Sequence, residues 1–378
     1  MKVVHVVRQY LPSVGGMEEV VRSLAHHQLA SGRYQPSVLT LNRVFRAGGA
    51  VLAAQENMGG VAVRRLGFGG SERYPLCPQV ALSLRQADLM HVHGIDFFFD
   101  YLALLHPLMG KPLVASTHGG FFHSGYAKRL KAMYFQSVTR LSALAYRKVI
   151  ATSENDGALF GTVVRPHQLT VIENGVDIYK FQGAASQALR PMMIYFGRWS
   201  INKGLLECLD LLSALRMQQP ETPWQLLIAG REYDLDAAAL RSYAQAHGVG
   251  DCVKLFPNPD NTELRRLLAQ ASYFLCLSHH EGFGIAPIEA ISAGLVPLLS
   301  PIPPFVRLFK ATGAGALLDA GTPTLQAAQV TRLHARLQLG AFRSEAYLHA
   351  LREAIARYSW TGVAARYTRE YDLAMGLA

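Results

Sequence analysis

Short runs of aliphatic and β-branched residues alternate along the chain with longer stretches whose apolar residues recur every three or four positions. The short runs predict buried strands, and the longer stretches predict amphipathic helices. In the first half the predicted strands are KVVHVV, PSVLTL, DLMHVH, PLVAST and KVIATS, with a helix over Met17–Ser31. Strands and helices in alternation are typical of βαβ units, so we predict a parallel, Rossmann-like sheet.

The same alternation restarts in the second half. There the predicted strands are PMMIYFG, WQLLIAG, CVKLF, YFLCLS and LVPLLS. We therefore predict an α/β protein with two Rossmann-like domains, residues 1–184 and 185–360. The last stretch, 361–378, has apolar residues at helical spacing and could cap the second domain.

Length and composition exclude several classes of protein. With 378 residues, half of them hydrophobic, the chain can bury two substantial cores and is not predicted to be disordered. The most apolar passage is interrupted by histidines and aspartates, and the amino terminus lacks the pattern of a signal peptide. Four scattered cysteines without a CxxC pair favour a reducing cytoplasm.

The positive charge is concentrated in the first half. Up to Ser186 the chain carries 19 Lys and Arg against 11 Asp and Glu, whereas the remainder carries 18 against 16. Such an excess suits nucleic acid, an anionic membrane or an acidic substrate, and composition alone does not choose among them.

The stretch HHEGFGIAPIEAISAG places two carboxylates, Glu281 and Glu289, among apolar and small residues after a predicted strand. A helix is predicted over Pro287–Ala293, and its amino terminus could bind an anion that Gly282 and Gly284 allow to approach closely. The two carboxylates could then accept hydrogen bonds from a ribose and from a further sugar. The alternative is one capping and one surface glutamate.

Two cations follow the first strand of the second half. Arg198 and Lys203 lie in the loop GRWSINKG, where they could clamp a diphosphate. A solvated loop pair is the alternative, and the nearby glutamates make it less favourable.

Weaker signals lie at strand ends of the first half. Gly15 and Gly16 form a double glycine that permits close approach of a phosphate or sugar, although a lone pair of this kind is usually only a loop. His118, followed by two glycines, is a candidate for contact with a reacting sugar, with a packed core histidine as the alternative. Several other histidines lie nearby, but no metal-ligand spacing is present, so we predict no metal.

Two further segments were assigned by their local pattern. Asp234 and Asp236 resemble a metal-binding acidic pair, but their position before a helical stretch favours helix capping. The segment 121–148 interleaves basic and aromatic residues, which suits an anionic bilayer or an ordinary amphipathic helix. Its predicted membrane or acceptor contacts are Phe121, Phe122, Lys128, Arg129 and Lys131.

The motifs GRWSINKG, HHEGFGIAPIEA and IENGVD resemble those of retaining glycosyltransferases of family 4, which have the GT-B fold. Within that family, VVHVVRQYLPSVGGMEEVV, DFFFD, ASTHGGFFH, AGREYDL and SPIPPF are similar to the α-mannosyltransferases of xanthan-type and acetan-type exopolysaccharide synthesis. The resemblance implies GDP-mannose as donor, a polyprenyl-diphosphate-linked cellobiose as acceptor, no metal and no nucleic acid. It also implies a cytoplasmic enzyme, peripheral on the inner face of the membrane, whose helix 361–378 crosses back to the first domain.

The resemblance assigns a role to each matching residue. Arg198 and Lys203 would contact the donor diphosphate, Glu289 the ribose, Glu281 the donor sugar, and His118 the sugar near the reacting carbon. Gly15 and Gly16 would lie beside the donor phosphate. The remaining donor-binding positions are those of the glycine-rich stretch, Gly282, Phe283, Gly284 and Ile285.

Three other classes remain open from the residues. A nicotinamide oxidoreductase would need G-x-G-x-x-G after the first strand, and that motif is not found there. A sugar-nucleotide epimerase would act without an acceptor. A non-catalytic sensor would bind the nucleotide sugar and never release the nucleotide.

Overall fold

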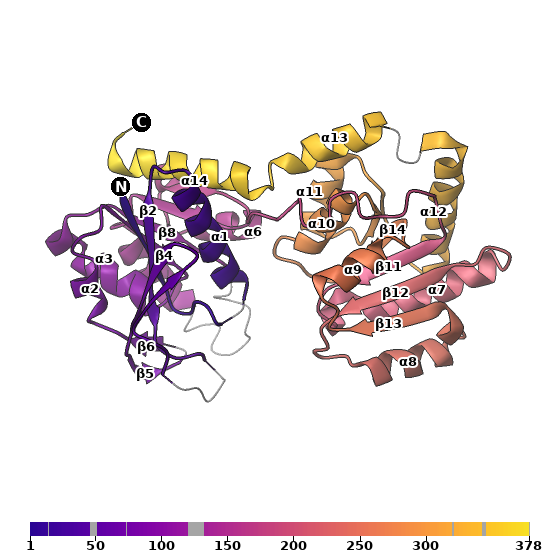
Figure 1. Ribbon diagram of the computed structural model, residues 1–378, viewed down its shortest axis with the longest axis horizontal. Coiled ribbons are helices and arrows are strands. Elements are labelled where there is room, and N and C mark those ends of the chain that lie inside the picture. The colour runs from indigo at the N-terminus through magenta and orange to yellow at the C-terminus, as the bar shows by residue number, and fades with distance from the viewer. Residues whose placement is uncertain are drawn as a thin grey trace. The chain divides into compact units, whose positions relative to one another are not determined.

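The computed structural model describes residues 1–13, 15–45, 51–72, 74–119, 132–319, 321–341 and 345–377. The chain divides into two compact units (Figure 1). Unit 1 comprises Met1–Gly175 together with Trp360–Ala378, and unit 2 comprises Val176–Ser359. The division follows Gly175 rather than residue 184, because Val176 and the segment after it pack in the core of unit 2.

Unit 1 is built on a sheet in the order β10-β9-β8-β7-β1-β2-β4-β3. All neighbours pair in parallel except β3 and β4, which are antiparallel. Its strands are β1 (Lys2–Val7), β2 (Gln35–Leu41), β3 (Gln55–Met58), β4 (Val61–Leu66), β7 (Leu89–His93), β8 (Leu113–Ser116), β9 (Lys148–Ala151) and β10 (Leu169–Val171), with a separate hairpin of β5 (Gly69–Ser71) and β6 (Tyr74–Leu76). The five strands predicted in this half are confirmed, whereas β3 to β6 and β10 were not predicted.

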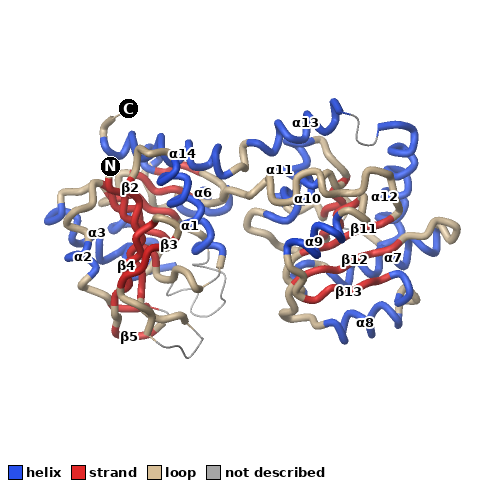
Figure 2. Tube along the Cα trace, viewed as in Figure 1, coloured by secondary structure: helices blue, strands red, loops and turns tan. Residues whose placement is uncertain are grey.

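Helices surround this sheet (Figure 2). They are α1 (Gly16–Ala30), α2 (Val80–Ser83), α3 (Phe97–Met109), η1 (Phe135–Thr139), α5 (Arg140–Ala143), α6 (Glu154–Phe160), η2 (Pro166–Gln168) and α14 (Trp360–Met375). The predicted helix over 17–31 is thus confirmed as α1. The C-terminal helix α14 packs in unit 1, where Val363, Tyr367 and Tyr371 share a core cluster with Val3 and Leu24.

Unit 2 is built on a fully parallel sheet in the order β13-β12-β11-β14-β15-β16. Its strands are β11 (Met192–Phe196), β12 (Gln225–Gly230), β13 (Val253–Pro257), β14 (Tyr273–Cys276), β15 (Val296–Leu299) and β16 (Ala316–Leu317). Five of them were predicted, and only the two-residue β16 was not. The order reverses between β11 and β14, and in such sheets ligands bind outside the carboxyl ends of the strands at this point.

The helices of unit 2 are η3 (Ile201–Lys203), α7 (Leu205–Gln218), α8 (Ala237–Ala246), η4 (Gly250–Cys252), α9 (Asn261–Leu268), α10 (Ile285–Ala293), α11 (Pro303–Thr312), α12 (Pro323–Arg336), η5 (Leu337–Ala341) and α13 (Glu345–Ala356). Helix α10 starts two residues before the predicted helix. It ends at Ala293 and is followed by Gly294, whose φ of 92° makes it the left-handed C-cap that the sequence predicts.

Candidate functional site

The loop between β11 and α7 carries the two predicted cations. Its path depends on Gly204, which has a φ of 68°, and a Cβ built there would lie 2.1 Å from the backbone oxygen of Leu277. Only glycine fits this close approach. The loop is therefore held against the end of β14, and this brings Lys203 to the segment that carries Glu281.

Lys203 and Glu281 form an ion pair, with 2.5 Å between Nζ and Oε1. Both side chains are largely buried, and Ser278 also donates to the same carboxylate oxygen at 2.9 Å. The contact joins the two predicted donor-binding motifs of unit 2. Glu281 is thus not a surface glutamate, and the alternative assignment for this residue is wrong.

Glu289 is the fifth residue of α10 and pairs with Lys180 at 3.5 Å. Burial raises the pKa of the Glu289 carboxyl, and the positive charge of Lys180 opposes that rise. Lys180 was not predicted, because it lies in a weakly patterned stretch next to the expected domain boundary.

The amino terminus of α10 has no side-chain cap. Its N-cap is Gly284, with a φ of 93°, and no acidic residue lies in its first turn. The first N–H groups of the helix therefore lack a side-chain acceptor, as an anion site requires. Phe283 packs on Tyr358 with ring centroids 5.6 Å apart, Gly282 has open space around its Cα, and Ile285 is exposed.

Arg198 occupies the start of the same loop as Lys203 and is exposed. Its guanidinium lies over the ring of Tyr233, 4.7 Å from the centroid.

The neighbouring acidic residues have structural roles. Asp236 caps α8 by accepting from the backbone N–H of Ala239, as predicted, whereas Asp234 accepts from the Ser200 hydroxyl at 2.5 Å. Asp234 is therefore not a helix cap. It instead holds the loop of Arg198 and Lys203 in place through its hydrogen bond with Ser200.

A cavity of about 330 Å³ adjoins Glu289 at the carboxyl ends of β11 to β13. Glycine at the end of β12 lets the ends of β11 and β12 approach closely beside this cavity, since a Cβ at Gly230 would lie 1.7 Å from the backbone oxygen of Gly197. The polar side chains lining it are Lys180, Arg231, Asn258 and Glu289. Arg231 and Asn258 were not predicted, and the only sequence signal for them is their position directly after strands.

In unit 1, His118 follows β8 and has a φ of 54°, an uncommon value for a residue with a side chain. The carboxylate of Asp156 accepts from the residues on either side of it, from the Thr117 hydroxyl at 2.7 Å and from the Gly119 backbone N–H at 2.9 Å. Asp156 thus stabilises the strained position of His118. Burial lowers the pKa of the His118 imidazole, which is therefore neutral at pH 7.

The remaining predicted positions of unit 1 divide into two groups. Gly15 is the N-cap of α1, which begins at Gly16, so the double glycine stands at the start of a helix. A Cβ at Gly15 would meet the carboxylate of Glu18. The predicted membrane contacts Phe121, Phe122, Lys128, Arg129 and Lys131 lie outside the described residues. Among the described residues, no helix is long and apolar enough to cross a bilayer.

Comparison with known proteins defines the class. Residues 14–180 match the family described as Glycosyltransferase Family 4, and residues 180–343 match Glycosyl transferases group 1. Solved structures with the same fold include a sucrose-phosphate synthase from Thermosynechococcus elongatus (TM-score 0.69, 17% identity, covering 100% of both chains) and a glycosyltransferase from Rickettsia africae (TM-score 0.73, 15% identity, covering 100% and 99%). The chain therefore belongs to the glycosyltransferases that these two family descriptions name, and it has the GT-B fold.

Similarity to curated proteins extends over the full chain. A GDP-mannose:cellobiosyl-diphosphopolyprenol alpha-mannosyltransferase from Xanthomonas campestris is 50% identical over 378 residues, covering 100% of this chain and 98% of the relative. A protein of the same name from Komagataeibacter xylinus is 40% identical, covering 100% and 94%. A phosphatidyl-myo-inositol mannosyltransferase of Mycobacterium tuberculosis is 27% identical, covering 95% and 92%.

Proposed function

We propose that this protein transfers an α-mannosyl residue from GDP-mannose to a cellobiosyl diphosphopolyprenol, with retention of anomeric configuration, in exopolysaccharide synthesis. Full-length identity of 50% to relatives named for this donor and acceptor supports the choice of substrates. The observation that carries the proposed chemistry is the contact of Lys203 with Glu281 beside the uncapped amino terminus of α10.

The diphosphate is assigned to the positive end of this site. Lys203, Arg198 and the free N–H groups of α10 supply fixed positive charge, which stabilises a departing diphosphate most when negative charge develops on it. Lys203 would exchange part of its contact with Glu281 for the phosphate, so that the carboxylate is freed to accept from a hydroxyl of the donor sugar.

The nucleoside is assigned to the cavity beside Glu289. The carboxylate would accept hydrogen bonds from the ribose diol, and the base would enter the space lined by Arg231 and Asn258. The ion pair with Lys180 favours the ionised, hydrogen-bond-accepting form of Glu289 despite its burial.

In the proposed reaction the bond between the anomeric carbon and the β-phosphate oxygen breaks while an acceptor hydroxyl attacks from the same face. The proton of that hydroxyl passes to the leaving phosphate, so no carboxylate base is needed. The proposed chemistry uses no metal, because side-chain cations and helix N–H groups supply the positive charge. His118 is proposed to contact the sugar near the reacting carbon.

The direct test is a panel of nucleotide sugars incubated with a lipid-linked cellobiose, following nucleotide release and product linkage. We expect GDP release to depend on both GDP-mannose and acceptor, with an α-mannosyl product. An epimerase would convert the nucleotide sugar without acceptor, and a sensor would bind it without releasing GDP. Either result would overturn the proposal.

We further propose that unit 1 docks on the anionic cytoplasmic face of the cell membrane, where a polyprenyl-linked acceptor is presented. Helices α3 and α5 contact each other and carry exposed apolar side chains, Leu104 and Leu108 on α3 and Leu141 on α5. Arg140 is exposed next to Leu141, and apolar residues beside basic ones suit a headgroup region. Arg140 and Leu141 lie within the predicted basic segment 121–148, and α3 precedes it in the chain.

Vesicle sedimentation tests this docking. The double substitution Leu104→Ser and Leu108→Ser should reduce binding to vesicles with anionic lipid about a hundredfold, because the two apolar side chains together contribute roughly 3 kcal/mol when buried. The same pair of substitutions should leave GDP binding unchanged. Matched substitution of the exposed Leu339 of unit 2 is the control. Binding that is insensitive to the α3 substitutions would contradict this surface.

A further inference from the structure

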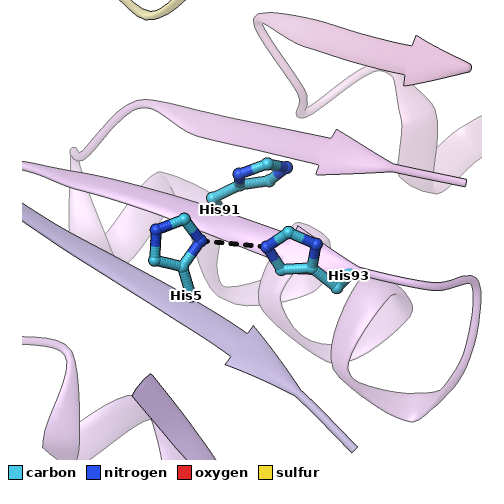
Figure 3. A group of neighbouring side chains, drawn as sticks. All are labelled: His5, His91 and His93. Carbon is cyan, nitrogen blue, oxygen red and sulfur yellow. Dashed lines mark hydrogen bonds between the residues drawn. The ribbon is translucent and has the colours of Figure 1, made fainter. Parts of the chain in front are cut away.

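Three buried histidines of the unit 1 sheet, His5, His91 and His93, each bring a ring nitrogen within 4.8 Å of the others (Figure 3). A metal is the obvious candidate ligand, yet the ring nitrogens already take part in hydrogen bonds with other side chains. His91 contacts the Tyr371 hydroxyl at 2.6 Å and the Ser116 hydroxyl at 2.8 Å. Its ring centroid lies 4.0 Å from that of His93 with only 35° between the planes. Both ring nitrogens of His91 are therefore already hydrogen-bonded, and the three rings do not offer one ion a common set of free lone pairs.

The other two histidines belong to a hydrogen-bonded chain that leads to His118. The Gln28 side-chain oxygen lies 2.8 Å from Nε2 of His5, and Nδ1 of His5 lies 3.0 Å from Nε2 of His93. Nδ1 of His93 lies in turn 2.9 Å from Nε2 of His118. Each contact has the length of a good hydrogen bond.

The positions of the protons follow from the first member. A neutral imidazole donates through one nitrogen and accepts through the other, and burial lowers the pKa of both His5 and His93, which keeps them neutral. A carbonyl oxygen can only accept, so His5 must donate from Nε2 and accept at Nδ1. His93 then donates from Nε2 and accepts at Nδ1, and His118 donates from Nε2.

A second hydrogen-bonded chain begins at the same Gln28 amide. Its NH₂ group donates to the Tyr371 hydroxyl at 3.2 Å, and that hydroxyl can then donate to His91, which donates in turn to Ser116. With the amide in this orientation each contact of the two chains pairs one donor with one acceptor. A reversed amide would reverse both chains together and place the His118 proton on Nδ1, which is the result that would overturn the assignment.

We propose that Gln28, His5 and His93 are positioning residues that fix the ring of His118 with its proton on Nε2 and its lone pair on Nδ1. In the part of the chain that the structure describes, Nδ1 of His118 has no hydrogen-bond partner. It would accept a hydrogen bond from a hydroxyl of the reacting sugar, and this part of the inference rests on the function proposed above.

Nuclear magnetic resonance of protein with ¹⁵N-labelled histidine tests the relay without any substrate. We expect protected N–H signals on Nε2 of His5, His93 and His118, with Nδ1 of His118 unprotonated. The substitutions Gln28→Leu and His5→Phe should each speed exchange of the His118 Nε2 proton about tenfold, because the chain then loses its terminal acceptor. His118→Ala identifies the signal.

The matched control is Ser116→Ala. Ser116 is equally buried and contacts His91 and Tyr367, so its loss disturbs the same core without touching the relay. The His118 signal should be unchanged in this variant. If Gln28→Leu does not fold, His5→Phe supplies the same comparison.

Kinetics provide the second readout. In the transfer assay, Gln28→Leu should lower kcat about tenfold and change KM for the donor less than twofold, as loss of an orienting partner does. Protons on Nδ1 of His118 in the wild-type protein, or a stoichiometric metal with loss of the N–H signals, would overturn the relay. A relay seen by resonance in a protein that does not transfer mannose would instead count against the proposed function.

Discussion

At the residue scale, the central feature is the ion pair of Lys203 and Glu281. Each residue was predicted as a separate donor contact, and the structure adds that they contact each other. Separating such a largely buried pair costs free energy unless both charges gain new partners. A diphosphate and a sugar hydroxyl are partners of the required kinds, so donor binding and rearrangement of this pair are expected to be linked.

Replacing Lys203 tests this link. We expect Lys203→Ala to lower kcat/KM for GDP-mannose about 10²- to 10³-fold, with a fall in kcat as well as in donor affinity, because the cation stabilises the leaving group. Steady-state nucleotide release measures both constants. Lys310→Ala removes an exposed lysine of the same unit and should have no effect. Unchanged turnover in Lys203→Ala would argue against the clamp.

Sequence patterns located the residues that lie close to a strand end but not their partners in space. Arg198, Lys203, Glu281 and Glu289 were predicted because motifs and strand ends point to them. Lys180 could not be found, since it lies in a segment without periodicity and meets Glu289 only through the fold. The ion pairs and the cavity depend on which strands are neighbours in the sheet, and the local hydrophobic pattern does not predict strand order.

At the element scale, a strand lies at every position where a short apolar run predicted one, because buried parallel strands have a characteristic composition. Edge strands such as β3 and β10 were missed, since β3 is mostly exposed, β10 is short and half-buried, and neither has a clear apolar pattern. Strand β1 was predicted from its valines, yet its most consequential side chain is His5. That residue interrupts the apolar run and packs against histidines of β7.

These histidines predict how the stability of the protein depends on pH. Burial lowers the pKa of His5 from 6.5 to about 4, so the folded state favours the neutral ring. Stability from this group is present above pH 6.5 and is lost as pH falls toward 4. Urea unfolding should show a loss of about 2 kcal/mol from His5 alone between pH 7 and pH 5. In His5→Phe the pH dependence should be shallower; an equal slope would contradict the assignment.

At the scale of the whole molecule, the two ends of the chain belong to one unit. The sequence left open whether the last helix caps the second domain, and the family resemblance implied that it crosses back to the first. The structure places α14 in the core of unit 1, with Trp360 packed so closely on Gly175 that a Cβ there would lie 2.4 Å from the indole. The local sequence pattern could not predict this position, because the apolar face of an amphipathic helix fits either hydrophobic core.

The contribution of α14 can be measured by substitution. Trp360→Ala should lower the free energy of unfolding by about 3–5 kcal/mol, as loss of a buried aromatic side chain does. Arg369→Ala, an exposed position on the same helix, should change it by less than about 0.5 kcal/mol. Urea denaturation compares the two variants, and equal effects would show that α14 does not stabilise unit 1.

The most direct measurement for the account as a whole is a structure with GDP-mannose bound. The account predicts the diphosphate within hydrogen-bond distance of Lys203 and of the first N–H groups of α10, with Glu289 on the ribose and Glu281 on the sugar. A diphosphate bound elsewhere, with the Lys203–Glu281 and Lys180–Glu289 pairs unchanged, would contradict it.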